Sequence, residues 1–102
     1  MAEIYGVYHD GKSVPEEIGV KGTEDEINRV AESIEGKTAK TVRGSAELLD
    51  EAPSPENPHP PVVEVFDFIR MPADKSLVRD ITSTVEVECD DPRLIDWMRD
   101  DA

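Results

Sequence analysis

The densest block of β-branched and aromatic residues runs over residues 62–71. Prolines bracket this block, and its valines, phenylalanines and isoleucine suit a pleated surface, so we predict a β-strand inside a sheet, with helix on one side. Charges interrupt it at spacings of three, at Glu64, Asp67 and Arg70. These charges fall on both faces of a strand, which predicts a β-bulge near Phe66 or a second covering surface. If the outer face is uncovered, it becomes the best interface candidate.

A second strand-like pattern covers residues 81–89. Apolar residues alternate there with threonine and glutamate, which is typical of a strand with one buried face. Cys89 falls on the apolar side, as a small core residue. We expect this strand to pair antiparallel with residues 62–71. The intervening residues 71–80 are too many for a tight hairpin, so they predict a projecting loop or a turn of helix.

The N-terminal segment has the pattern of a hairpin. Residues 3–9 predict a strand, and the Asp10-Gly11 dipeptide that follows favours a type I′ turn. A return strand begins at Lys12 and is short, because Pro15 lacks a backbone donor. Residues 15–22 are then an extended connection that contacts the core.

Two segments have the period of amphipathic helices. Residues 23–35 begin with a capping box, Thr23 with Glu26, and end before Gly36. Their apolar face consists of Ile27, Val30, Ala31 and Ile34. The second helix runs over residues 92–101, with an Asp-Pro start. Its apolar stripe consists of Leu94, Ile95, Trp97 and Met98.

The middle of the chain is less regular. Residues 37–44 predict a short strand, and Ser45 caps a brief helix over 46–51 with Leu48 and Leu49 facing inward. One longer helix is the alternative, which Gly44 disfavours. Residues 53–61 hold five of the eight prolines, so we interpret them as a polyproline II spacer that crosses some distance. A PxxP peptide ligand is the alternative interpretation.

Together these elements predict a single α+β domain over residues 1–102. The expected order is β-β-α-β-(α)-β-β-α, with a mainly antiparallel sheet and the helices near 23–35 and 92–101 on one face.

The charge is extreme for a chain of this length. Twenty-four acidic residues face 11 basic ones, giving a net charge of -13. Screening lengths fall from about 10 Å at 0.1 M salt to about 3 Å at 1 M, so high salt relieves this self-repulsion. The acids are spread along the chain, and the composition resembles that of haloarchaeal proteins, which work in molar salt. An ordinary acidic, partly disordered protein is the alternative.

The single cysteine, Cys89, excludes an intrachain disulfide and fits a reducing compartment. The chain has no apolar run of membrane-spanning length and no signal-peptide pattern. We therefore expect a cytoplasmic protein, or one incorporated into a virus particle assembled in the cytoplasm.

No pattern in the sequence indicates catalysis. Adjacent carboxylates are expected in so acidic a chain, and phosphate-binding and nucleophile motifs are missing. His9 beside Asp10 is the one metal or acid–base alternative. We predict no catalytic residue, no metal and no cofactor, and hence no enzyme.

The charge disfavours direct nucleic-acid binding. Lys37, Lys40 and Arg43 form a local basic patch, which we interpret as one side of an ion-pair network rather than a phosphate site.

These exclusions favour a non-enzymatic assembly or adaptor protein that acts by protein contact, such as a small virion head–tail or tail component, in homo- or hetero-oligomers. The alternatives are an acidic regulator or DNA mimic that binds a nucleic-acid-binding partner, and a small-ligand-binding domain or enzyme. The predicted partner-binding residues are Leu94, Trp97 and Met98 on the last helix, and Phe66 and Phe68 on the strand.

Overall fold

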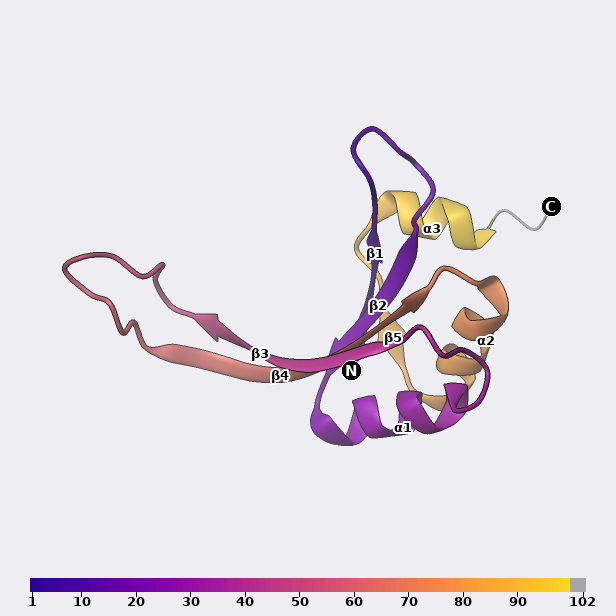
Figure 1. Ribbon diagram of the computed structural model, residues 1–102, viewed down its shortest axis with the longest axis horizontal. Helices are drawn as coiled ribbons and strands as arrows, with labels where there is room; N and C mark the ends of the chain where they lie inside the picture. Colours follow the sequence, from indigo (N-terminus) through magenta and orange to yellow (C-terminus); the bar gives the residue numbers. More distant parts are fainter. Residues whose placement is uncertain (100–102) are drawn as a thin grey trace.

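The computed structural model describes residues 1–99, which form an α+β fold with one mixed sheet and helices on one of its faces (Figure 1). The strands are β1 (Ala2–Val7), β2 (Glu17–Gly22), β3 (Val42–Leu49), β4 (Val62–Pro72) and β5 (Val87–Glu88). The helices are α1 (Glu24–Ile34), α2 (Lys75–Thr84) and α3 (Pro92–Arg99). The predicted fold class is confirmed, but the element order is β-β-α-β-β-α-β-α.

The strands lie in the order β3-β4-β2-β1-β5. All neighbours are antiparallel except β1 and β5, which are parallel. The predicted strand over 62–71 is confirmed as β4. It is an inner strand only over residues 67–70, where it pairs with β2 on one side and β3 on the other, while Met71 and Pro72 pair with β2 alone. Its N-terminal half pairs with β3 alone.

A single apolar cluster holds the helices against the sheet. Alternate residues of β1, β2 and β4 point toward the helices and are almost completely buried. The sheet contributes Ala2, Ile4, Ile18, Val20, Ile69 and Met71. The helices contribute Ile27, Val30, Ile34, Leu77, Val78, Ile81 and Leu94. The buried apolar stripe predicted for α1 is therefore confirmed, while no helix within residues 1–99 covers the opposite face of the sheet (Figure 1).

The start of α1 is the predicted capping box. The Glu26 backbone N–H donates to Thr23 Oγ1 over 3.3 Å, and the Thr23 backbone N–H donates to Glu26 Oε1 over 3.0 Å. This second hydrogen bond lowers the pKa of the Glu26 carboxyl. Gly36 follows the helix at a φ of 78°, in the left-handed region that glycine adopts without strain.

Replacing Thr23 with alanine removes the acceptor for the Glu26 N–H. We expect the free energy of unfolding to fall by about 1 kcal/mol, as measured by urea denaturation. Thr41→Ala is the matched control, because Thr41 is an exposed threonine ahead of β3. The control should change stability by less than about 0.5 kcal/mol. Equal effects of both variants would contradict a stabilising role for the cap.

The strand predicted over residues 81–89 is wrong in its first half, which belongs to α2, whereas the turn of helix that we considered for residues 71–80 is confirmed as the start of α2. Asp74 caps α2, and its carboxylate accepts a hydrogen bond from the Ser76 N–H over 2.8 Å. Leu77, Val78 and Ile81 form the buried face of α2. Of the predicted strand over 81–89, only Val87–Glu88 forms a strand, and it pairs with β1 rather than with β4.

The predicted helix over 46–51 is also wrong. Residues 46–49 belong to β3, where Leu48 is 52% exposed instead of facing inward, and residues 50 and 51 lie in the connection to β4. The proline-rich residues 53–61 do not cross a distance. They close the β3–β4 hairpin, where the Asp50 N–H donates to the Pro61 carbonyl over 2.9 Å. The proline-rich segment therefore begins and ends at the same end of the β3–β4 hairpin.

The N-terminal hairpin differs from its prediction in the second strand. β2 begins at Glu17 instead of Lys12, and it is a full strand with Ile18 and Val20 completely buried. At the other end, α3 confirms a helix beginning at Pro92. The predicted continuation to residue 101 lies outside the described residues. Within residues 1–99, no helix has the length and apolar character to cross a membrane.

Candidate interaction surface

The most prominent feature of the molecule is a two-stranded arm, defined here as residues 44–66. It extends from the body of the domain in Figure 1, and it makes the molecule long, with extents of 52 × 33 × 24 Å. The arm arises because β2 ends at Gly22, opposite Asp67. From Phe66 outward, β4 has β3 as its only partner in the described sheet.

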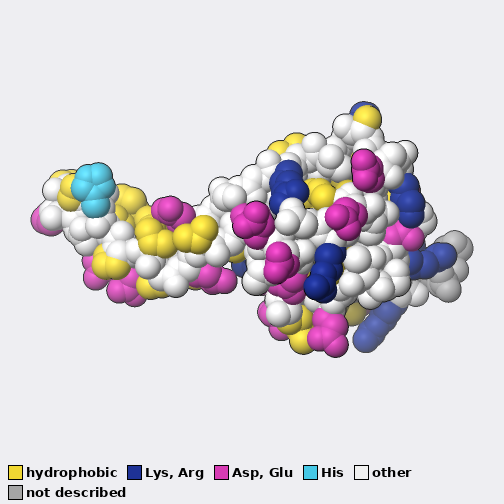
Figure 2. Space-filling view, turned by 90° about the horizontal axis from the view of Figure 1, so that it is seen from below, with side chains coloured by type: hydrophobic (Ala, Val, Ile, Leu, Met, Phe, Trp, Pro, Cys, Tyr) yellow, Lys and Arg dark blue, Asp and Glu magenta, His cyan; other side chains and the backbone are white. Residues whose placement is uncertain are grey.

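Large apolar side chains are exposed on both faces of this arm. Val62 and Val65 lie on the same side of the sheet as the buried Ile69, but the helices do not reach them, and they are 46% and 65% exposed. The neighbouring Val63 is 57% exposed. On the other face, Leu48 is 52% exposed. Figure 2 shows hydrophobic and acidic side chains together along the arm, while most lysine and arginine side chains lie over the body. The outer apolar surface of the predicted strand is therefore uncovered.

A β-bulge does occur in this strand, but at Val63 rather than near Phe66. The register pairs Leu48 with Glu64 and Leu49 with Val62, which leaves Val63 as the extra residue. The bulge does not bring the charges of β4 to one face. Asp67 stays on the helix side, where the Ser45 hydroxyl donates to its Oδ1 over 2.7 Å.

The uncovered face of the sheet continues from the arm into a shallow apolar groove. Its lining residues are Glu3, Tyr5, Val7, Lys21, Phe66, Phe68 and Arg70. Two rings lie flat on glycine backbone: a Cβ on Gly19 would come within 2.2 Å of the Tyr5 ring, and one on Gly44 within 2.8 Å of the Phe68 ring. These rings can lie so close to the backbone because glycine has no side chain.

The cations beside this groove are already paired. Lys21 Nζ lies 3.3 Å from Glu3 Oε2, and Arg70 Nη2 lies 2.6 Å from Glu17 Oε1. Lys21 also lies over the Phe66 ring, 5.3 Å from its centroid. The groove therefore presents aromatic surface with little net charge, in contrast to the acidic arm.

The predicted partner-binding residues separate into two groups. Phe66 and Phe68 lie together on the uncovered face, in the groove. Leu94 is completely buried in the core, so it cannot contact a partner in this structure. Trp97 and Met98 are partly buried and pack against the same core, which makes the α3 stripe an anchor for the helix. The exposed valines of the arm are further candidate contact residues, which the prediction did not include.

His9 and Cys89, the residues considered for metal binding, acid–base chemistry or thiol chemistry, form no reactive site among the described residues. His9 Nε2 lies 2.8 Å from Glu16 Oε2, and both side chains are exposed. No group of three or more metal-ligating side chains occurs within residues 1–99. Burial raises the pKa of the Cys89 thiol, which disfavours the reactive thiolate.

Two residues of the predicted basic patch, Lys37 and Arg43, form ion pairs as we predicted, while Lys40 forms no ion pair within residues 1–99. Lys37 Nζ lies 2.6 Å from Asp80 Oδ2. Arg43 donates a hydrogen bond to the Asn28 side chain, and its Nη2 lies 3.8 Å from Asp67 Oδ2.

Comparison of the chain with protein-family models, with curated proteins and with solved structures finds no match.

Proposed function

We propose that the protein is a non-enzymatic assembly or adaptor component that acts by protein–protein contact, and that the arm is its main contact element. The observation that carries this proposal is the exposure of Val62, Val63 and Val65 on a hairpin that projects beyond the helices. Burying a fully exposed side chain of this kind is worth about 1.5–3 kcal/mol. Because these valines are 46–65% exposed, a partner that covers the arm would gain about half of this energy for each of them.

The charges of the arm support a partner of complementary sign. The arm contains no lysine or arginine. Its acidic residues are Glu47, Asp50, Glu51, Glu56 and Glu64. A surface with an apolar floor and basic edges would fit it, because charge complementarity favours association and suppresses wrong partners.

The setting that we propose is molar salt, in a haloarchaeon or one of its viruses, and a small virion head–tail or tail piece is a concrete version. The net charge of -13 supports this setting. Contact between acidic molecules requires their long-range repulsion to be screened, and molar salt provides that screening.

The test is the assembly state of the tagged full chain, isolated from its source cells at about 2 M KCl. We expect a stoichiometric complex by light scattering, and its amount should fall when Val63 and Val65 are both replaced by threonine. Threonine keeps the β-branched shape but replaces a methyl group with a hydroxyl. Val14→Thr is the matched control, because Val14 is 58% exposed but lies in the loop between β1 and β2.

A strict monomer with no stoichiometric partner would overturn the proposal. If Val14→Thr reduced the amount of the complex as much as the arm variant does, the contact would depend on exposed apolar surface in general and not on the arm. If the chain instead displaced a DNA-binding protein from DNA at high salt, and the arm variants did so equally well, the acidic decoy function would be favoured.

A further inference from the structure

We infer that β3 pairs with β3 of a second copy of this chain across a two-fold axis, which joins two sheets into one. This inference rests on the proposed function and names one partner for it. It uses the edge of the arm, whereas the exposed valines of β4 lie on the faces of the arm and remain available to a different protein.

The β3 edge has the properties of a strand that accepts another strand. β3 is the outermost strand of the sheet, so one row of its backbone N–H and C=O groups has no strand partner in the described chain. Natural sheets usually protect such edges with charged side chains, lysine above all, with proline or with a bulge. Residues 42–49 contain neither lysine nor proline, and the bulge at Val63 belongs to β4. Their two charged residues, Arg43 and Glu47, have opposite signs and can pair with each other between two copies.

The sequence of β3 is self-complementary about Ser45: residues at equal distances on either side of it are of matching size or opposite charge. It reads apolar, basic, small, serine, small, acidic, apolar from Val42 to Leu48. In an antiparallel pair centred on Ser45, each residue faces one of complementary type. Arg43 faces Glu47 of the second copy, Gly44 faces Ala46, and Val42 faces Leu48. The two-fold axis repeats each of these pairs.

In this register, the dimer would bury two apolar side chains that are exposed in the single chain. Val42 and Leu48 are 54% and 52% exposed in the single chain, although both are large and apolar. Facing residues on antiparallel strands have Cβ atoms only about 4.5–5.5 Å apart, so each leucine would cover a valine. The dimer would thereby explain two exposed residues that the arm itself leaves without cover.

Neighbouring registers lack this complementarity. Facing residues must belong to the same hydrogen-bonding class, so the centre of a symmetric pair can shift only by whole residues. A centre on Gly44 would place Arg43 opposite Ser45, and a centre on Ala46 would place Arg43 opposite Leu49. Only the Ser45 centre places Arg43 opposite an acidic residue.

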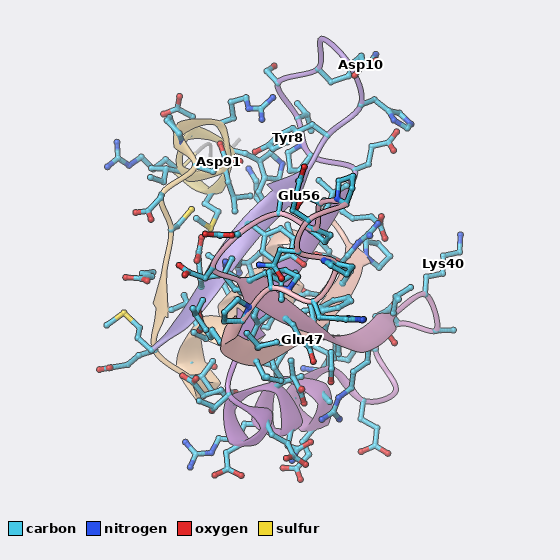
Figure 3. All side chains as sticks on the ribbon, turned by 90° about the vertical axis from the view of Figure 1, so that its left-hand side faces the viewer. Tyr8, Asp10, Lys40, Glu47, Glu56 and Asp91 are labelled. Carbon is cyan, nitrogen blue, oxygen red and sulfur yellow. The ribbon has the colours of Figure 1, made fainter. Side chains whose placement is uncertain are left out.

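The same register extends the charge match beyond the strand. Two positions further out, Asp50 of one copy comes opposite Lys40 of the other. Figure 3 shows Lys40 extending away from the rest of the chain into solvent, so its side chain is placed for such a contact. Because the strands run antiparallel, the acidic tip of each arm lies along the basic segment that precedes β3 in the partner copy.

Disulfide trapping tests the register. With Cys89→Ser as background, Ser45→Cys would place two thiols opposite each other at a Cα separation of about 4.5–5.5 Å, which a disulfide accepts. We expect a cross-linked dimer on mild oxidation at about 2 M KCl. Thr41→Cys in the same background is the control, because the two copies of residue 41 would lie about 26 Å apart.

Charge exchange tests the pairing in solution. Arg43→Glu or Glu47→Arg alone would create two like-charge pairs, and we expect each to weaken dimerisation by about 10- to 100-fold. The double variant restores opposite charges and should recover most of the affinity. Circular dichroism melting of each variant shows whether the fold persists, which matters because Arg43 also contacts Asn28.

Two results would overturn the inference: no cross-linking of the Ser45→Cys variant above the level of the Thr41→Cys control, or no recovery of dimerisation in the double charge variant. The proposed function would survive either result if a different protein still binds wild type more strongly than the Val63→Thr, Val65→Thr variant. A strict monomer without any partner would overturn both.

Discussion

Replacement of Ile27 by asparagine should leave the protein largely unfolded. Ile27 lies at the centre of the α1 contact with the sheet and is completely buried. Truncating a buried isoleucine to alanine costs about 2–5 kcal/mol, and a buried amide without a hydrogen-bond partner adds about 1–3 kcal/mol. Small domains have only about 5–15 kcal/mol of stability in total. Far-UV circular dichroism and urea titration at about 2 M KCl measure this loss.

Two control variants show whether the loss of stability comes from the packing of Ile27 or from any substitution in α1. Ile27→Val deletes one methyl group and should cost about 0.5–1.5 kcal/mol. Glu32→Ala changes an exposed position of the same helix and should alter stability by less than about 0.5 kcal/mol. An Ile27→Asn protein that melts like wild type would show that α1 does not hold the sheet in solution.

The midpoint of thermal unfolding, Tm, should rise steeply with salt. The chain carries a net charge of -13, and the ion pairs of the described residues are largely at the surface, where each contributes little. Screening the remaining repulsion stabilises the compact state. Relief of about 2 kcal/mol would raise Tm by about 8–16 °C for a domain of this size. Calorimetry between about 50 mM and 2 M KCl measures the change.

A less acidic variant provides the control for a charge effect. Glu32, Glu35 and Glu86 are exposed, and their replacement by lysine would change the net charge from -13 to -7, since each substitution adds two charges. This variant should show a smaller rise of Tm with salt. If wild type is as stable at about 50 mM as at about 2 M KCl, the composition does not reflect adaptation to salt.

The elements that were predicted correctly are those whose structure is determined by residues close together in the sequence. The capping box of α1 uses two side chains three residues apart, and both of its hydrogen bonds form. The strand over 62–71 has enough β-branched and aromatic residues to exclude other structures. In both segments, local preference and the tertiary contacts agree.

The segment after β4 was mispredicted because two periods compete in it. Alternation from Ile81 to Cys89 has the period of a strand, while Leu77, Val78, Ile81 and Val85 fit the period of a helix. The helix forms because Asp74 caps it and α1 lies beside it in the core. The packing against α1 is a long-range contact that the local pattern does not contain.

The candidate surface was predicted only in part, for a similar reason. Phe66 and Phe68 are recognisable as exposed candidates because β4 is apolar on both faces. Tyr5 joins them only through the pairing of β1 with β2, which places it on Gly19. Leu48 was assigned to a core because apolar residues usually mark one, whereas here it lies on an arm that no helix covers.

The arm supplies no residue to the buried cluster that holds the helices against the sheet. The residues that stabilise the fold and the residues that we propose for partner contact therefore lie in different segments of the chain. Apart from Gly44, against which the Phe68 ring lies, mutations at exposed positions of the arm leave the buried cluster intact, so the hairpin is free to diverge while the body stays constant. The same separation makes the hairpin a natural unit for exchange between related chains, which would transfer partner choice and leave the fold intact.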